Sequence, residues 1–253
     1  MSQPAVHYES YGEGPPMMLI TGLGGVGRGW GSIVDRFAQN HLTIVPDHPG
    51  TGQSAQPPDG YTIAQHARVM ADLLRELDCG PTHLVGSSTG GAIAQVMALD
   101  HRDVTKSIVL ADSWARPDDY FRHQFAMRKR ILAEQGVEAY TEASALFLFG
   151  AEYFRDNYGQ VLAWMALAGG ADPMVMAQRI DMIVAFDESA RLDQIDLPTL
   201  VLVGDADICT PQYLSRDLAD LIPGARLEIL RGGHLIYKEA PDQFHRAVKT
   251  FTG

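Results

Sequence analysis

The chain has 253 residues, which is enough for one large domain with a full hydrophobic core, whereas two domains of ordinary size would be a tight fit. Apolar residues make up 46% of the sequence and charged residues 20%, a composition typical of a soluble globular protein. The net charge of −11 argues against non-specific binding to nucleic acid or to an anionic membrane.

Targeting and membrane signals are weak throughout the sequence. The start shows no basic segment followed by an apolar run, and no stretch approaches the roughly eighteen apolar residues that a spanning helix needs. The two cysteines, Cys79 and Cys209, form no metal-ligand or Cys-x-x-Cys pattern, which favours reduced thiols. We therefore expect a cytoplasmic protein without a membrane span.

The first part of the chain alternates short apolar runs with helical patterns. The clearest helix is predicted over 62–78, because its apolar residues recur at helical spacing, Thr62 and Gln65 form a capping box, and Gly80-Pro81 stops it. An extended hairpin over residues 3–16 is expected to add antiparallel strands at one sheet edge. The other runs predict strands at 17–21, 42–47, 83–87 and 107–112, with helices over 30–39 and 90–100 between them.

The alternation breaks after the fourth of these strands. Residues 114–190 carry only helical patterns, and alternation resumes with strands at 197–204 and 225–230 and a last helix from Pro241. Strands that alternate with helices indicate a doubly wound, mainly parallel sheet in an α/β protein. We expect residues 1–113 and 191–253 to form that core, and 114–190 to form a helical cap over the carboxyl edge, where open α/β sheets bind ligands.

Gly86-Ser87-Ser88-Thr89-Gly90 is a G-x-S-x-G motif between a predicted strand and a predicted helix, where a nucleophile elbow lies. The turn leaves no room for side chains two residues before and after the serine, and glycine meets that demand at 86 and 90. An elbow on Ser87 would place Thr89 where a glycine is needed. The motif therefore favours Ser88 as the nucleophile over a strand–helix turn without catalysis.

A serine nucleophile needs a base and an orienting acid, which in this architecture follow it in the order Asp, His. His234 follows the predicted strand 225–230 and is flanked by glycines, unlike the other histidines. Three acids stand after predicted strands: Asp205 and Asp207 after 197–204, and Asp112 after 107–112. The residues alone leave the choice of acid open.

Three segments in order resemble the α/β-hydrolase superfamily: LVGSSTGGAIAQ, LVLVGDADICTP and GGHLIYKEAPDQF. They are most similar to the branch that contains 3-oxoadipate enol-lactonases and aminoacrylate hydrolases, and the resemblance covers nearly the whole chain. It implies that Asp207 is the acid and that Asp205 is a loop residue. The stretch RKRILAEQGVEAYTEASALFLF resembles the aminoacrylate-hydrolase branch.

The oxyanion hole is expected to use backbone N–H groups from the residue after the nucleophile and from the loop after an earlier strand. These groups belong to Thr89 and Leu23. The sequence departs from the family at Thr21, where histidine is usual, and at Pro49, where arginine is usual. Since the donors are backbone groups, the first change need not remove function.

The glycines Gly22, Gly24 and Gly27 also fit G-x-G-x-x-G after a strand, and Asp47 lies twenty residues beyond Gly27, as in dinucleotide-binding sites. Against this interpretation, Asp47 opens a Pro/Gly-rich turn, and the same glycines suit a loop that approaches a substrate carbonyl. We expect no cofactor. No cluster has metal-ligand spacing and no P-loop motif is present, so no metal or P-loop nucleotide is expected.

The predicted cap carries candidates for a substrate pocket. Arg128, one of several basic residues there, could bind a substrate carboxylate in a bidentate manner, although a solvated helix face is the plainer interpretation. Trp114 follows strand 107–112 and could line a pocket or simply bury the cap against the core.

The expected partner is a small-molecule substrate, and the oligomeric state, monomer or homodimer, is left open. We expect hydrolysis of a small carboxylic ester or enol-lactone by Ser88, His234 and Asp207 through an acyl-enzyme. The alternatives are a C–N hydrolase of the aminoacrylate-hydrolase kind, a carbon–carbon bond hydrolase, and a ligand-binding receptor with a vestigial triad.

Overall fold

A seven-stranded sheet forms the centre of the part of the chain that the structure describes, in the order β1-β3-β2-β4-β5-β6-β7. The structure, a computed structural model, describes residues 5–168 and 170–253, so that residues 1–4 and 169 of the predicted ranges lie outside it. Every neighbouring pair is parallel except β1 and β3. The strands are β1 (Tyr8–Tyr11), β2 (Pro16–Ile20), β3 (Leu42–Pro46), β4 (Thr82–Ser87), β5 (Thr105–Ala111), β6 (Thr199–Gly204) and β7 (Arg226–Leu230).

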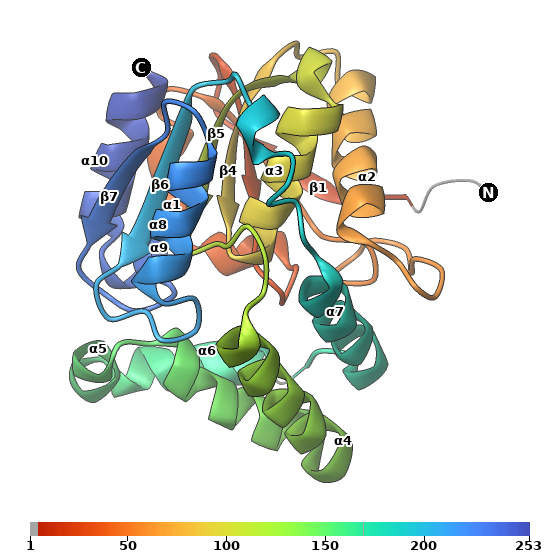
Figure 1. The fold of residues 1–253 in the computed structure, drawn as a ribbon, viewed down its shortest axis with the longest axis vertical. Coiled ribbons are helices and arrows are strands. Elements are labelled where there is room, and N and C mark those ends of the chain that lie inside the picture. The colour runs from red at the N-terminus through yellow and green to blue at the C-terminus, as the bar shows by residue number, and fades with distance from the viewer. Residues whose placement is uncertain (1–4, 169) are drawn as a thin grey trace.

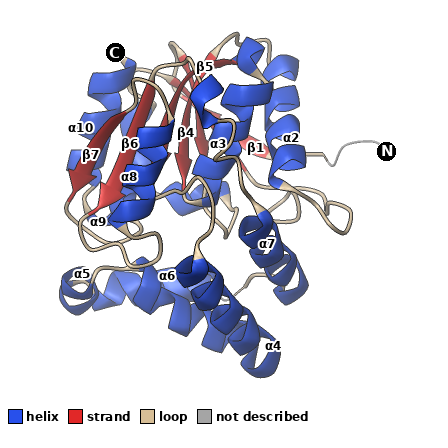
Figure 2. Ribbon diagram, viewed as in Figure 1, coloured by secondary structure: helices blue, strands red, loops and turns tan. Residues whose placement is uncertain are grey.

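Helices lie on both faces of this sheet, which confirms the predicted doubly wound α/β class (Figure 1, Figure 2). In β2, alternate residues enter two different cores: Met18 and Ile20 pack with α2, α3 and α8, whereas Met17 and Leu19 pack with α1, α9 and α10. This period of two is the strand geometry of a sheet buried on both faces. The helices are α1 (Ile33–Phe37), α2 (Ile63–Glu76), α3 (Thr89–Asp100), α8 (Gln212–Leu221), α9 (Ile236–Glu239) and α10 (Pro241–Thr252).

The sequence prediction was accurate for α2 and wrong for the N-terminal hairpin. Thr62 caps α2, and its hydroxyl and the Gln65 side chain form the predicted capping box. The hairpin over 3–16 is absent from the described residues 5–16. β1 is an antiparallel edge strand, but β3 lies between it and β2, so β1 pairs with β3 instead.

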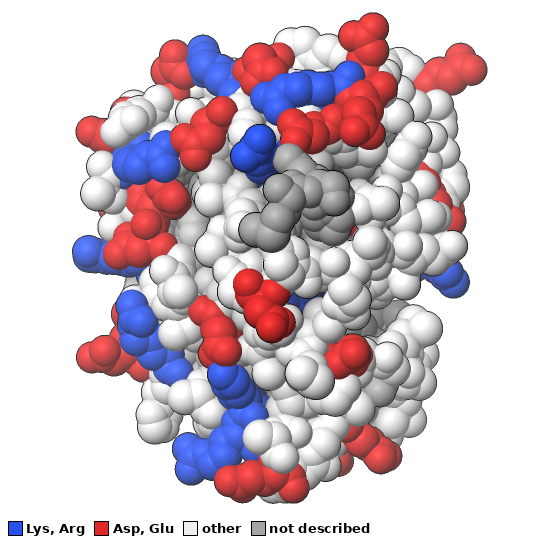
Figure 3. Space-filling view, turned by 90° about the vertical axis from the view of Figure 1, so that its right-hand side faces the viewer, with Lys and Arg blue, Asp and Glu red and all other residues white. Residues whose placement is uncertain are grey.

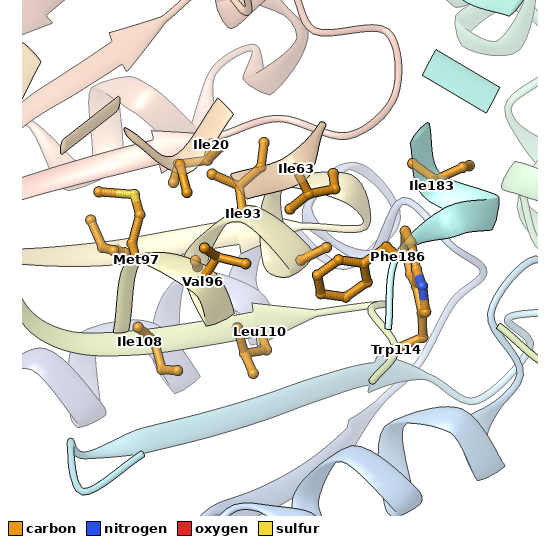
Figure 4. Packing of buried hydrophobic residues seen from close by; sticks show 14 of the residues in the cluster. Ile20, Ile63, Ile93, Val96, Met97, Ile108, Leu110, Trp114, Ile183 and Phe186 are labelled. Atoms are coloured by element: carbon orange, nitrogen blue, oxygen red, sulfur yellow. The ribbon is translucent and has the colours of Figure 1, made fainter. Parts of the chain in front are cut away.

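The chain between β5 and β6 is helical, with four helices gathered at the end of the sheet toward which β6 and β7 point (Figure 1). Buried residues join this layer to the core: Trp114, just after β5, lies against Phe121 of α4 and Phe186 after α7, and the same cluster continues to Ile183 (Figure 4). The helices are α4 (Asp119–Leu148), which is kinked at Gly136, α5 (Ala151–Asp156), α6 (Tyr158–Ala168) and α7 (Pro173–Ala185).

The face shown in Figure 3 carries positive and negative side chains next to one another rather than separated by sign. Exposed ion pairs such as Arg75 with Asp103 are typical of the surface. Within the described residues, no helix combines the length and apolar character needed to cross a membrane.

Candidate functional site

Ser88 lies at the sharp turn between β4 and α3 and has an unusual backbone. Its φ is 55° and its ψ is −116°, a conformation that a residue with a Cβ adopts only under strain. A Cβ at Gly86 would lie 2.2 Å from the Gly90 carbonyl oxygen, and one at Gly90 would lie 2.0 Å from the Ile20 carbonyl oxygen. Both glycines are therefore sterically required. Ser88 is partly exposed, whereas Ser87 is buried at the end of β4.

His234 and Asp207 form a buried pair at the ends of β7 and β6. The Nδ1 atom of His234 lies 2.9 Å from Oδ2 of Asp207, and 2% and 0% of the two side chains are exposed. The other carboxylate oxygen, Oδ1, accepts hydrogen bonds from the backbone N–H groups of Cys209 and Thr210, at 2.8 and 2.9 Å. The carboxylate is thus fixed on one side and presented to the imidazole on the other.

The hydroxyl of Thr210 was not predicted from the sequence, yet it lies at the centre of this arrangement. Its oxygen is 2.8 Å from Asp207 Oδ2, 3.1 Å from His234 Nδ1 and 2.9 Å from the carbonyl oxygen of Asp112. A threonine beside the acid in the segment DICTP was the only sequence signal. It connects the loops after β5, β6 and β7.

The same edge includes Ser88. The side chain of Ser113, directly after Asp112, donates a hydrogen bond of 3.0 Å to the Ser88 carbonyl oxygen. Among the described residues no hydrogen bond joins the Ser88 hydroxyl to His234. Catalytic hydrogen bonds are often long in unliganded enzymes and tighten around the substrate.

The two other acids occupy different positions. Asp205 is exposed, and its carboxylate accepts from the Gly232 backbone N–H at 2.9 Å. Asp112 is fully buried and accepts from the Gly204 N–H at 3.0 Å. In the described part of the chain, neither carboxylate contacts the imidazole of His234.

Burial and charge shift the proton affinities at this site. Burial is the largest single effect and opposes the charged form of His234, but Asp207 and Cys209 together outweigh it and hold the pKa of His234 well above its usual value. Burial, followed by the nearby charge of Asp207, raises the pKa of Asp112 well above that of an exposed aspartate. The imidazolium is thus the stabilised form beside Asp207.

A glycine-rich turn after β2 lies against the serine. A Cβ at Gly22 would be 3.3 Å from the Cβ of Ser88, and the Gly25 N–H closes the turn on the Gly22 carbonyl oxygen at 3.0 Å. Leu23 lies inside this turn. At the position where the family usually has histidine, the Thr21 hydroxyl oxygen is 3.4 Å from Nε2 of the buried His48.

The carboxylate of Asp47 is engaged by its own surroundings. It accepts hydrogen bonds from the backbone N–H groups of Gly27 and Gln53, at 2.8 and 3.0 Å, and lies 3.2 Å from His7. This acid therefore stabilises the loop geometry, which is a different role from binding a ribose hydroxyl.

Trp114 and Arg128 are both buried where the helical layer meets the core. The Trp114 ring packs between Phe121 and Phe186, at centroid distances of 4.7 and 6.1 Å. Arg128 is only 3% exposed, so it does not lie on a solvated helix face. It contacts the hydroxyls of Ser144 and Tyr140, at 3.1 and 3.2 Å, and Sγ of Cys209 at 3.7 Å.

Glu239 is a second residue that the sequence did not single out. Its carboxylate accepts from the backbone N–H groups of Gly233 and Gly150, at 2.9 and 3.1 Å. It therefore connects the turn before His234 to the start of α5.

A cleft of about 400 Å³ opens between the start of α2 and α7, and its lining includes neither Ser88 nor His234. Within the described residues, no group of three or more His, Cys, Asp or Glu side chains is arranged to hold a metal ion. The cleft is lined by residues 60–64, Gln178, Asp181, Met182 and residues 185–188.

Comparison with known proteins gives consistent matches over nearly the whole chain. The sequence model of the family described as alpha/beta hydrolase fold matches residues 15–241. A protein of Azorhizobium caulinodans named carbamate hydrolase RutD is 34% identical, over 98% of this chain and 95% of its own. Its namesake from Pseudomonas syringae pv. syringae is 35% identical, over 97% and 96%.

Solved structures are also similar. The enol-lactonase from Burkholderia xenovorans LB400 superposes with a TM-score of 0.92 at 25% identity, covering 98% of this chain and 96% of its own. A thermophilic esterase from Thermogutta terrifontis superposes with a TM-score of 0.89 at 26% identity, covering 98% and 93%.

Proposed function

Because this chain belongs to the α/β-hydrolase fold family and is a hydrolase, we propose that it cleaves a small carboxylic ester or lactone with a Ser88–His234–Asp207 triad. The observation that carries the proposal is the buried His234–Asp207 pair on the same sheet edge as the strained Ser88. No described residue other than Asp207 places a carboxylate against that imidazole.

In the proposed mechanism, Ser88 attacks the substrate carbonyl while His234 accepts its proton. Asp207 keeps the imidazole in the tautomer that has its proton on Nδ1 and stabilises the imidazolium that forms. The raised pKa of His234 beside the Asp207 carboxylate supports this role. His234 then protonates the leaving group, and water releases the acyl group from Ser88.

The tetrahedral intermediate carries a negative charge that needs donors. We assign them to the backbone N–H groups of Leu23 and Thr89, each worth about 3 kcal/mol in the transition state. The position of Gly22 supports this assignment: a Cβ there would lie 3.3 Å from the Cβ of Ser88, so the turn that contains Leu23 lies next to the proposed nucleophile.

The substrate class rests on more than one resemblance. The enol-lactonase and the esterase among the solved structures favour a lactone or an ester. The relatives named carbamate hydrolase favour a C–N substrate as the second candidate.

Arg128 is the candidate contact for a substrate carboxylate. Its buried guanidinium has no carboxylate partner among the described residues and lies against Cys209, two residues after the proposed acid. An acidic substrate would supply the missing counter-charge.

The free Cys79 and Cys209 accord with a reducing compartment, and we infer a cytoplasmic location.

The nucleophile is tested by Ser88→Ala, with Ser87→Ala as the matched control. Loss of the attacking oxygen should reduce kcat for p-nitrophenyl acetate by roughly 10⁴-fold or more, with an unchanged circular dichroism spectrum. The control should keep both activity and labelling by a fluorophosphonate. A folded Ser88→Ala protein with wild-type turnover contradicts the assignment.

The substrate class is tested by kcat/KM for an ester, a lactone and a carbamate of similar size, each with and without a carboxylate. We expect the carboxylated ester or lactone to exceed the carbamate at least tenfold. A carbamate turned over faster than both establishes the second candidate instead.

A further inference from the structure

Arg179 is a buried cation whose side chain extends from the helical layer to loops of the core. It belongs to α7, which lies between β5 and β6 in the chain, and only 5% of the residue is exposed. Its Nη1 donates a 2.7 Å hydrogen bond to the carbonyl oxygen of Leu23, and its Nη2 donates a 2.9 Å bond to the carbonyl oxygen of Pro49. One guanidinium thus joins two loops of the core.

The first of these loops contains the proposed oxyanion donor. Fixing the Leu23 carbonyl restrains the turn that orients the Leu23 N–H. The contact is close: a Cβ at Gly25 would lie 2.1 Å from Nη1 of Arg179, and Gly25 has a φ of 72°. Any side chain at Gly25 would therefore collide with the guanidinium as well as strain the turn.

The second loop is also hydrogen-bonded directly to the first. The backbone N–H of His48 and the hydroxyl of Thr51 both donate to the Gly25 carbonyl oxygen, at 2.7 and 2.9 Å. Pro49, between them, has no N–H group and no polar side chain, so only its carbonyl oxygen can take part in a hydrogen bond. Arg179 donates to that oxygen and so adds a second link between the loop of Pro49 and the turn of Leu23.

Neutral groups surround this cation. Tyr61, His48 and His66 are its titratable neighbours, and in the described part of the chain Arg179 forms no ion pair with a carboxylate. Burial lowers the pKa of Arg179 to about 10, which leaves it charged at neutral pH. The pKa values of His48 and His66 are lowered well below the usual value, first by burial, so both are uncharged there. The positive charge near Leu23 is therefore uncompensated.

We propose that Arg179 is a positioning residue for the oxyanion hole, through which α7 of the helical layer sets the geometry of the Leu23 turn. Its two donors fix the Leu23 turn to the loop that contains Pro49, and its unneutralised charge favours the negative oxygen of the intermediate. The proposal rests on the proposed function. It predicts that the loss of Arg179 affects the transition state more than substrate binding.

The test compares Arg179→Met and Arg179→Lys with Arg122→Met. Arg122 is a suitable control because it also donates to a backbone carbonyl oxygen, that of Val184, but is exposed on α4. We expect Arg179→Met to lower kcat for p-nitrophenyl acetate at least thirtyfold, with KM changed less than threefold. Arg179→Lys, which keeps the charge but loses the planar fork, should give an intermediate loss of at least fivefold. Arg122→Met should behave as the wild type.

A second measurement separates positioning from general damage. A trifluoromethyl ketone inhibitor forms a hemiketal whose oxyanion occupies the hole, so its Ki should rise in parallel with the loss in kcat. The pH midpoint of kcat/KM, which reports His234, should stay unchanged. If Arg179→Met does not fold, the kcat, the inhibitor Ki and the pH midpoint of Arg179→Lys test the proposed role of Arg179 instead.

Two outcomes overturn the inference: a folded variant with kcat within threefold of the wild type, or a loss in kcat without any change in Ki. Failure of the proposed function looks different, because Ser88→Ala would then remain active. An inactive Ser88→Ala together with fully active Arg179 variants rejects only the role of Arg179.

Discussion

Two buried aspartates near His234 differ in what surrounds each carboxyl group. Asp207 accepts two backbone hydrogen bonds on Oδ1 and faces Thr210 and the imidazole with Oδ2, which suits a carboxylate. Asp112 accepts a hydrogen bond on Oδ1 from the Gly204 N–H, and the Ile236 N–H lies near the same carboxyl group, but no described donor meets hydrogen-bond geometry at Oδ2. Burial, followed by the charge of Asp207, raises the pKa of Asp112 and so opposes its charged form. The same residue type thus stands in two different environments, which the hydroxyl of Thr210 connects.

This difference predicts opposite results for the two asparagine variants. Asp207→Asn should lower kcat for p-nitrophenyl acetate by roughly 10⁴-fold, because the amide cannot support the required imidazole tautomer or its charge. Asp112→Asn introduces an uncharged amide of the same shape at a site where burial already opposes the charged form, and it should change kcat less than threefold. A loss of more than a hundredfold in Asp112→Asn would show that the charge of Asp112 takes part.

At the scale of elements, the turn between β4 and α3 depends on close packing of backbone on backbone. The Gly86 site faces the Gly90 carbonyl, so nothing flexible can move aside for an added methyl group. Gly159, inside α6, has no heavy atom within 4 Å of where its Cβ would lie. An added methyl group would therefore meet a steric clash at Gly86, whereas at Gly159 it would affect only the helix propensity.

We predict that Gly86→Ala lowers the free energy of unfolding by about 3 kcal/mol, because the turn must open to admit the methyl group. Gly159→Ala should leave it unchanged or raise it by up to ~1 kcal/mol, since alanine is the better helix former. Urea unfolding of both variants measures the difference. Equal stabilities would argue against the elbow geometry.

At the scale of the whole molecule, histidines are buried in a neutral form far from the carboxyl edge of the sheet. His83 of β4 lies 2.7 Å from the Ser107 hydroxyl of β5, at the opposite end of these strands from Ser88. Burial, then the positive charge of Lys106, lowers the pKa of His83 to about 4. Between about pH 4 and pH 6.5, this imidazole is therefore neutral in the folded protein, whereas in the unfolded chain it is protonated.

The sign of this linkage predicts acid sensitivity. The unfolded pKa is about 6.5, so the stabilising contribution is complete above pH 6.5 and is lost as the pH falls toward 4, at up to ~1.4 kcal/mol per pH unit. Urea unfolding at pH 7.5, 6 and 5 should show this decline. His83→Asn, which keeps a hydrogen-bonding side chain, should show a shallower one. Identical slopes in the two proteins would exclude His83 as a contributor.

Local pattern was sufficient for most of the fold. The apolar runs and the capped helix were predicted within a few residues, because burial on both faces and helix capping are decided by neighbouring residues. The hairpin over 3–16 was wrong, because pairing of β1 depends on β3, some thirty residues further along the chain. The four-residue α9 was missed, since so short a helix has no periodicity to detect.

The sequence by itself determined the motif around Ser88, the position of His234 after the last predicted strand, and a helical insertion. It did so because steric demand at a turn and strand–helix alternation are local properties. Only the tertiary structure decided which carboxylate contacts the imidazole and that a guanidinium from α7 reaches Leu23 and Pro49. Those contacts join segments up to 156 residues apart. They arise from packing at one sheet edge, which spacing along the chain does not encode.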